Sequence, residues 1–210
     1  MKILKKADII AVLLCLSAII PGAAVYSRLP ARIVTNWTLN AEENGSMPKA
    51  VAVFVLPVVF AVIELLSCIY LNRLEEKQPG GKHTAILRIL FPVILFLSQG
   101  TILLHALGKL SDPLLIACTF VSVVMIVLGN YMPKFRRNWL VGIRTPHIVS
   151  DETIWYQTHR LAGFTVTGGG VLSLVTSLLG LVIATFVILV LSLLIPMLYG
   201  ERLYYARKRG

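Results

Sequence analysis

The sequence predicts an all-α membrane protein, a polytopic bundle of about six transmembrane helices. Hydrophobic residues make up 57% of its 210 residues, and charged residues make up only 14%. The apolar residues form runs of about 20, the length that crosses a bilayer core. The lysines and arginines behind the net charge of +10 lie almost entirely between these runs. This pattern argues against a soluble enzyme and makes the lipid bilayer, rather than nucleic acid, the expected partner of the basic residues.

The first two spans are expected at about residues 7–25 and 50–71. The first contains Pro21-Gly22 and is followed by further apolar sequence, so a cleavable signal peptide is the weaker interpretation. The second contains Pro57, and neighbouring helices of a bundle can satisfy the backbone group that a proline leaves free. The polar residues 26–49 lie between these spans.

The third and fourth spans are expected at about residues 85–107 and 113–130, after a loop at 72–84 that mixes charges with Pro-Gly-Gly. The short sequence GKLSDP joins them, in which Ser111 or Asp112 can cap a helix that begins at Pro113. These spans should therefore form a tight helical hairpin.

The last two spans share one uncharged run, Leu161–Tyr199. Its 39 residues are nearly twice the roughly 20 that one span needs, so we expect a split near Leu179-Gly180 into spans at about 161–179 and 181–199. The chain would then have an N-terminal membrane half, residues 1–131, and a C-terminal half, residues 132–210.

The distribution of basic residues predicts the orientation. With both termini in the cytoplasm, only Arg28, Arg32, Lys49 and Lys109 of the 20 basic residues fall outside. The positive-inside rule therefore places the 26–49 segment outside and the 131–160 segment inside.

The 131–160 segment is longer than a connection requires, which is typical of a functional loop. Pro133 and Pro146 exclude a continuous helix, and the residue before Pro146 should be extended. A helix should restart with Ser150 as its N-cap, because Asp151 and Glu152 suit the positive end of a helix dipole. We expect a short interfacial helix that leads into the fifth span.

Two stretches resemble known families. Residues 129–163, GNYMPKFRRNWLVGIRTPHIVSDETIWYQTHRLAG, resemble the motif of the SdpI family, membrane immunity proteins against a secreted bacterial cannibalism toxin. The stretch LPARIVTNWTLNAEENGSMPK resembles the LP-x-x-IP-x-HWN-x-x-G segment of a domain of unknown function that commonly precedes it. Val34, Asn36 and Thr38 depart from that second motif, and His147 stands where the first often has Trp.

The resemblance implies a six-span protein of the bacterial cytoplasmic membrane that protects its producer from a toxin peptide. In the best-known system such a protein also tethers a small transcriptional repressor at the membrane. The resemblance assigns partner binding on the cytoplasmic side to Asn130, Pro133, Lys134, Asn138, Gly142, Arg144, Thr145, Pro146, Trp155, His159 and Arg160. On the outer side it singles out Leu29, Pro30, Asn36, Trp37 and Gly45.

A role without partner binding also stays open for the basic residues, since any single arginine next to a span also binds anionic lipid and fixes topology. Arg144 is the best exception because Gly142 and Pro146 constrain its backbone. A purely regulatory anchor for a repressor, without toxin resistance, is a further alternative.

Polar residues inside the spans suggest an alternative from another class. Glu64, Gln99 and His105 could line a proton or cation path in a small transporter or channel. A purely structural interpretation pairs Glu64 with Arg88, or with interfacial water near Arg73. In this interpretation Gln99 and His105 form hydrogen bonds between helices. Gly168-Gly169-Gly170 indicates close helix packing or a local break in the fifth span.

No catalytic residue, cofactor or metal site is expected. No nucleophile stands beside an evident base, and the spacing of His147, Asp151, Glu152 and His159 matches no familiar metal motif. The cysteines, which all lie inside apolar runs, are interpreted as small buried hydrophobes: Cys15, Cys68 and Cys118.

Overall fold

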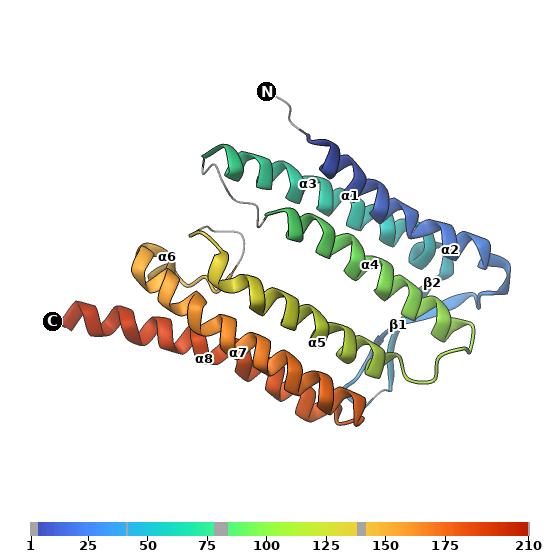
Figure 1. Cartoon of the computed structure of the whole chain (residues 1–210). Helices are drawn as coiled ribbons and strands as arrows, with labels where there is room; N and C mark the ends of the chain where they lie inside the picture. Colours follow the sequence, from blue (N-terminus) through green and yellow to red (C-terminus); the bar gives the residue numbers. More distant parts are fainter. Residues whose placement is uncertain (1–3, 41, 78–83, 138–141, 210) are drawn as a thin grey trace. The chain divides into compact units, whose positions relative to one another are not determined.

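The computed structural model describes residues 4–40, 42–77, 84–137 and 142–209 (Figure 1). The chain divides into two compact units, Met1–Pro113 and Leu114–Gly210. In the described residues six helices are long and apolar enough to cross a membrane, which confirms the all-α polytopic prediction. The fourth span belongs to the C-terminal unit.

The helices of the N-terminal unit form three spans. The first consists of α1 (Lys6–Ser17) and α2 (Ile19–Ala24), the second of a short π-helix (Val51–Val55) followed by α3 (Leu56–Lys77), and the third lies in α4 (Thr84–Ala106). The break between α1 and α2 falls where a helix would need an N–H from Pro21 for the Ser17 carbonyl, which proline cannot supply. The predicted span 7–25 is therefore two helical pieces.

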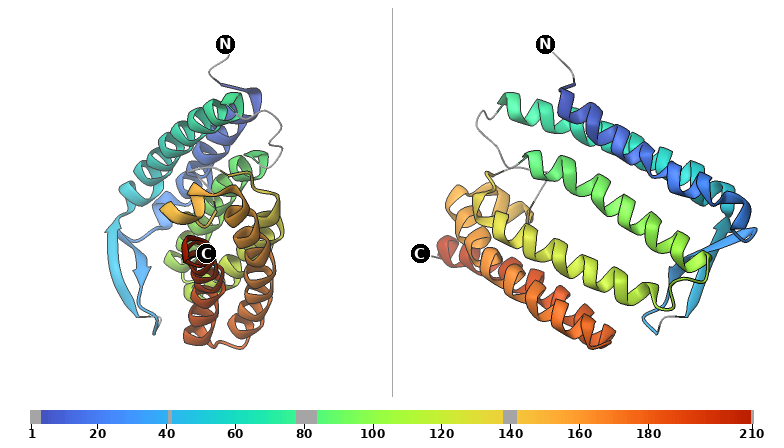
Figure 2. Two further views of the ribbon diagram at one scale, coloured as in Figure 1. Left: turned by 90° about the vertical axis from the view of Figure 1, so that its left-hand side faces the viewer. Right: turned by 45° about the vertical axis from the view of Figure 1, so that its right-hand side comes forward.

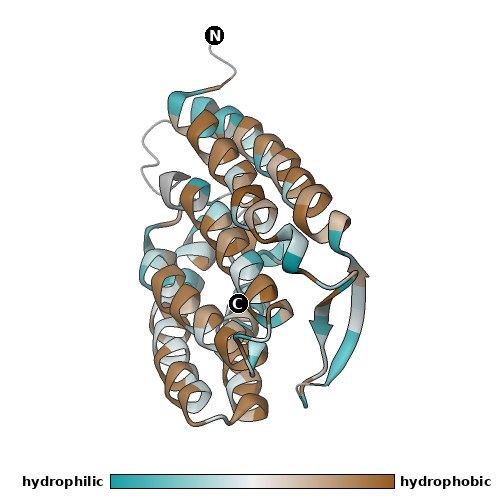
Figure 3. Cartoon of the chain, turned by 90° about the vertical axis from the view of Figure 1, so that its right-hand side faces the viewer, coloured by the Kyte–Doolittle hydropathy of each residue, from teal (hydrophilic) through white to brown (hydrophobic). Residues whose placement is uncertain are grey.

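The 26–49 segment contains a β-hairpin that the sequence analysis did not predict. Strand β1 (Arg32–Trp37) pairs antiparallel with β2 (Glu43–Pro48), with Ile33 opposite Met47 and irregular register beyond Val34. Buried Ile33 packs in a cluster with Leu29, Ala52, Val53 and Leu103. Figure 2 shows the hairpin beside the end of α4, and Figure 3 shows mostly polar strands and mostly apolar helices.

The C-terminal unit contains α5 (Pro113–Tyr131), a 3₁₀ turn (Met132–Lys134), α6 (Pro146–Ser150), α7 (Glu152–Leu178) and α8 (Val182–Arg209). Helices α7 and α8 run side by side (Figure 2). Their connection includes Gly180, whose φ of 72° is one that glycine adopts without a Cβ penalty. The predicted split near residues 179–180 and the predicted start of a helix at Pro113 are both confirmed.

Two details of the predicted fifth span were wrong. Its N-cap is Asp151, whose Oδ1 accepts hydrogen bonds from the N–H groups of Thr153 (2.7 Å) and Ile154 (3.1 Å). Ser150 instead ends α6. The expected interfacial helix is the first part of α7, which continues for 27 residues without interruption. The reason is that Asp151 caps well and no proline follows it within the run.

Glycines allow the helices of the C-terminal unit to approach closely. A Cβ atom on Gly169 would lie 2.4 Å from Ser192 Cβ of α8, and one on Gly170 would lie 2.8 Å from Ile126 of α5. A Cβ atom on Gly129 of α5 would lie 2.5 Å from the Thr167 backbone nitrogen of α7. Close packing, rather than a local helix break, is therefore the role of Gly169 and Gly170.

Large apolar side chains remain exposed on the spans, including Leu66 on α3, Phe164 on α7 and Ile183 on α8. Such a surface would be costly in water and is the one that lipid chains cover. The chain is a multi-pass membrane protein.

Candidate functional site

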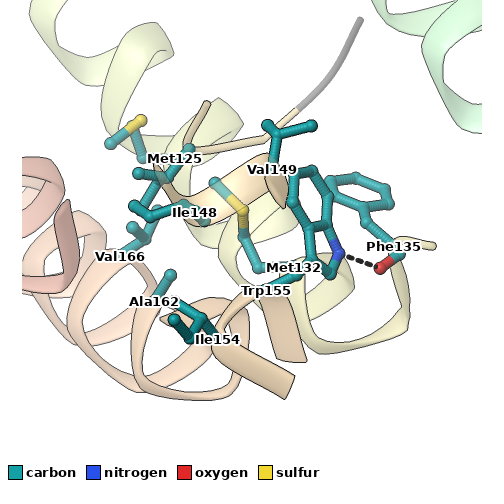
Figure 4. Close-up of a cluster of buried hydrophobic side chains, with 10 residues drawn as sticks. Met125, Met132, Phe135, Ile148, Val149, Ile154, Trp155, Ala162 and Val166 are labelled. Atoms are coloured by element: carbon teal, nitrogen blue, oxygen red, sulfur yellow. Dashed lines mark hydrogen bonds between the residues drawn. The ribbon is translucent and has the colours of Figure 1, made fainter. Parts of the chain in front are cut away.

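The 131–160 segment folds back onto α7 around Trp155 and His159, which are both fully buried. The Trp155 Nε1–H donates to the Phe135 carbonyl at 2.8 Å, so it satisfies a backbone group just after the 3₁₀ turn (Figure 4). The His159 ring stacks on the Trp155 ring, with centroids 3.9 Å apart. One turn of α7 therefore fixes the path of the segment that precedes it.

His159 is held as one neutral tautomer by its two hydrogen bonds. Its Nε2 accepts the Ile143 N–H at 3.2 Å, so this nitrogen carries no proton. Its Nδ1 lies 2.9 Å from the Trp155 carbonyl and must be the donor. Gly142 makes this contact feasible, because a Cβ there would lie 2.2 Å from Nε2 and its φ is 111°. These four residues, Gly142, Ile143, Trp155 and His159, are called the His159 pin below.

The His159 pin adjoins the main apolar cluster of the C-terminal unit. Figure 4 shows Met132 and Phe135 from the turn, Ile148 and Val149 from α6, and Ile154 and Ala162 from α7 in one group. The predicted residues Thr145 and Pro146 begin α6, since the Thr145 hydroxyl accepts the Ile148 N–H at 3.2 Å and Pro146 occupies the first turn. Pro133 contacts α7, where a Cβ on Gly163 would lie 2.6 Å from its Cγ.

Two polar contacts connect α6 and the start of α7 to the end of α8. His147 Nδ1 lies 2.6 Å from Glu201 Oε2, and the His147 ring stacks on Tyr204 at 4.1 Å. Arg207 donates to Asp151 Oδ2 at 2.5 Å. The backbone N–H of Ile154, followed by that of Thr153 and by Arg207, lowers the pKa of the Asp151 carboxyl. His147 was not predicted as a site residue, but it connects α6 to the end of α8.

The basic residues of the segment remain on the surface. Arg144 and Arg160 are exposed, as are Asn130 and Lys134, whose Nζ lies 4.9 Å from the Tyr131 ring centroid. Asn138 lies outside the described residues. The predicted partner residues thus divide into a buried set that holds the segment and an exposed set that a partner could reach.

In the hairpin most of the predicted residues are exposed. Of its predicted residues Pro30, Asn36 and Gly45 are exposed, whereas Leu29 is buried and Trp37 is half-buried. Arg32 joins the strands by donating to the Ser46 hydroxyl (3.0 Å) and carbonyl (2.8 Å).

His105 attaches the hairpin to the end of α4. Its Nε2 lies 3.4 Å from Glu43, its Nδ1 lies 3.0 Å from the Leu110 carbonyl, and its ring meets Trp37 edge-on.

The three intramembrane polar residues lie at different levels of the N-terminal unit. Gln99 donates to the Ala52 carbonyl at 3.0 Å in the π-helix. Because Ala52 precedes Glu64 by 12 residues, these levels are about 18 Å apart along a helical axis. His105 contacts Glu43 of the hairpin. The structure does not bring the three side chains together.

Arg88, one of the two partners expected for Glu64, forms no ion pair with it among the described residues. Glu64 Oε1 accepts a hydrogen bond from the Cys68 thiol at 3.2 Å. Arg88 instead forms ion pairs with Asp8 (3.2 Å) and Glu75 (2.9 Å). The competition favours Asp8 because Asn72 bonds to the carboxylate of Asp8 and to the guanidinium of Arg88.

Asp8, Asn72, Glu75 and Arg88 form a cluster that was not predicted from the sequence. Two signals could have found it. Asp8 is an acidic residue at the start of an apolar run, and α3 carries Glu64, Cys68, Asn72 and Glu75 at intervals of four, four and three residues, which is one helix face.

Two parts of the chain match known protein families. Residues 134–200 match the SdpI/YfhL protein family, a range that contains the His159 pin, α6 and α7. This part of the chain is similar to the SdpI family. The resemblance that the motifs indicated is thereby confirmed.

The SdpI family match is accompanied by two further similarities. Residues 12–61 match a domain of unknown function (DUF1648), which covers the hairpin. The immunity protein SdpI of Bacillus subtilis (strain 168) is 28% identical over 209 residues, 99% of each chain. No solved structure matches the chain.

Proposed function

We propose that the protein is a non-catalytic immunity protein, which protects its cell from a membrane-active toxin peptide. The observation that carries the proposal is its similarity to the immunity protein SdpI over 99% of both chains. Because the similarity spans the hairpin, the His159 pin and every candidate membrane span, it supports a shared function of the whole protein rather than of one domain.

We assign toxin contact to the hairpin and contact with a cytosolic repressor to the exposed face of the 131–160 segment. The first assignment rests on the exposed side chains of Pro30, Asn36 and Gly45. The second rests on Arg144 and Arg160, which are exposed beside a rigid pin and suit an acidic partner surface. Both assignments require the hairpin outside the cell and the termini inside, as the basic residues predict.

Survival of a toxin-sensitive bacterium tests the proposal. Cells that express the chain should survive the toxin peptide encoded in the same genome, and cells with an empty vector should not. An unchanged killing curve at verified membrane expression would contradict the proposal. Asn36→Ala should reduce protection while Ser150→Ala, an exposed residue of the other segment, should not.

A repressor pull-down tests the second assignment separately. Arg144→Ala should reduce capture of the repressor, and Arg202→Ala, an exposed arginine beyond the family match, is the matched control. Equal capture by both variants would remove Arg144 from the contact.

The orientation can be measured with single cysteines. Asn36→Cys should react with a membrane-impermeant maleimide in intact cells, whereas Ser150→Cys should react only after lysis. The native cysteines Cys15 and Cys68 are buried and give little background, and Cys118→Ala removes the third. The reverse pattern would invert the predicted topology.

A transporter or channel is less favoured, because Glu64, Gln99 and His105 each have protein partners at separate levels. Reconstituted vesicles test this alternative. Proton or cation flux above that of protein-free vesicles, lost in Glu64→Gln, would revive it.

A further inference from the structure

Helix α3 carries a buried polar stripe on the face that packs against α1. It consists of Glu64, Cys68 and Asn72, which are spaced four residues apart and are at most 6% exposed. Glu64 lies deepest, since nine residues separate it from Arg73 at the end of the candidate span, about 14 Å along the axis. A carboxyl group at this depth is shielded from water by the surrounding helices.

The cations near the stripe form ion pairs with carboxylates other than that of Glu64. Arg88 Nε lies 3.2 Å from Asp8 Oδ1 in an ion pair, and Arg88 Nη2 donates to Asn72 Oδ1 and Glu75 Oε1, both at 2.9 Å. Lys5 forms an ion pair with Glu75. Among the residues that the structure describes, no ion pair reaches Glu64, and its hydrogen bond comes from the Cys68 thiol.

The charges around Glu64 do not balance if every carboxyl is ionised. Asp8 and Cys15 face it from α1, Cys68 and Glu75 lie along its own helix, and Arg88 lies on α4. With Lys5, the group contains three carboxyls and two cations. A third negative charge, buried and without a cation, would be the costliest state of this cluster.

We propose that Glu64 is a proton-binding site, whose carboxyl group carries a proton at neutral pH. The proton makes the cluster electrically neutral, with Asp8 and Glu75 balanced by Arg88 and Lys5. The proton stays in place, because Gln99 and His105 are committed to other levels of the unit. Release of the proton would put a second carboxylate beside Asp8 in competition for Arg88, and would weaken the packing of α1 on α3.

Infrared spectroscopy of the purified protein at neutral pH tests the proposal directly. The parent should show a carbonyl stretch of a protonated carboxylic acid that is absent in Glu64→Gln. Asp151→Asn, which removes a carboxyl that is paired with Arg207 outside this cluster, should lose only intensity from ionised carboxylate. If Glu64→Gln instead loses ionised carboxylate intensity, Glu64 is charged and the proposal is overturned.

A second variant leaves the carboxyl in place. Cys68→Ala removes the thiol donor, so the protonated carbonyl stretch should move to higher frequency while the band persists. An unchanged band would show that it belongs to another group.

The pH dependence of thermal unfolding gives an independent readout. The midpoint of the parent should fall as the pH is raised above the unfolded pKa of a glutamate, about 4.3, because the folded state then binds more protons than the unfolded state. The midpoint of Glu64→Gln, a neutral isostere, should fall less. Equal slopes would contradict the proposal. Since none of these readouts involves a toxin, they can fail or succeed independently of the immunity function.

Discussion

The hairpin and the 131–160 segment both connect spans, yet they hold their family motifs in different ways. In the 131–160 segment the motif residues Trp155 and His159 stack on each other and form hydrogen bonds with the backbone, and Gly142 packs against His159. In the hairpin Asn36 and Gly45 pair with each other across the strands and stay exposed.

This difference indicates that one motif serves folding and that the other is available for contact with a partner. The His159 pin is explained by packing and hydrogen bonds, so its residues should be needed for folding whatever the protein binds. The exposed residues of the hairpin have few structural duties and are free to contact a partner. Paired substitutions in the two regions can break this contrast or sharpen it.

The largest expected effect is that of Gly142→Ala. A Cβ would meet His159 Nε2, and φ of 111° is strained for alanine, so the free energy of unfolding should fall by about 3 kcal/mol. Gly45→Ala is the matched control, because its Cβ would meet Asn36 Cβ at an ordinary 3.4 Å. Its change should stay within about 0.5 kcal/mol. Thermal unfolding in detergent measures both, and equal losses would end the contrast.

The two tryptophans give an intermediate effect. Trp155→Phe deletes the donor to the Phe135 carbonyl and should cost about 1–3 kcal/mol. Trp37 Nε1 is buried without a partner among the described residues, so Trp37→Phe should cost less than about 1 kcal/mol. The same unfolding measurement compares them. A greater loss at Trp37 would mean that the hairpin, too, is held by its motif.

The smallest expected effect is at Asp151. Because the folded protein lowers its pKa, Asp151 stabilises the fold above its unfolded pKa of about 3.9, and this contribution is lost as the pH falls through the lower folded value.

Asp151→Asn should therefore flatten the acid limb of stability, at a cost below about 1 kcal/mol near neutral pH. Asp151→Ala, which also loses the helix cap, should cost about 1 kcal/mol more. Thermal midpoints between about pH 3 and pH 6 measure the slope. A parent slope retained in Asp151→Asn would assign it to another group.

Several expectations failed where local sequence cannot decide between partners. Arg88 was available to Glu64 by sequence, but Asp8 lies 80 residues away in the chain and becomes its partner only when α1 packs on α3 and α4. The hairpin was missed because β1 is short and β2, ENGSMP, has little strand propensity, so pairing with a neighbour creates it.

The sequence by itself determined the six spans, the turn at Gly180, the helix start at Pro113 and the resemblance to the SdpI family. Apolar length, helix-stop residues and motifs are local properties. Only the tertiary structure decided which polar groups meet. It assigned His159 to the Ile143 N–H, His105 to the hairpin and Arg88 to Asp8. The physical reason is that a buried polar group must find a partner wherever packing brings one within reach.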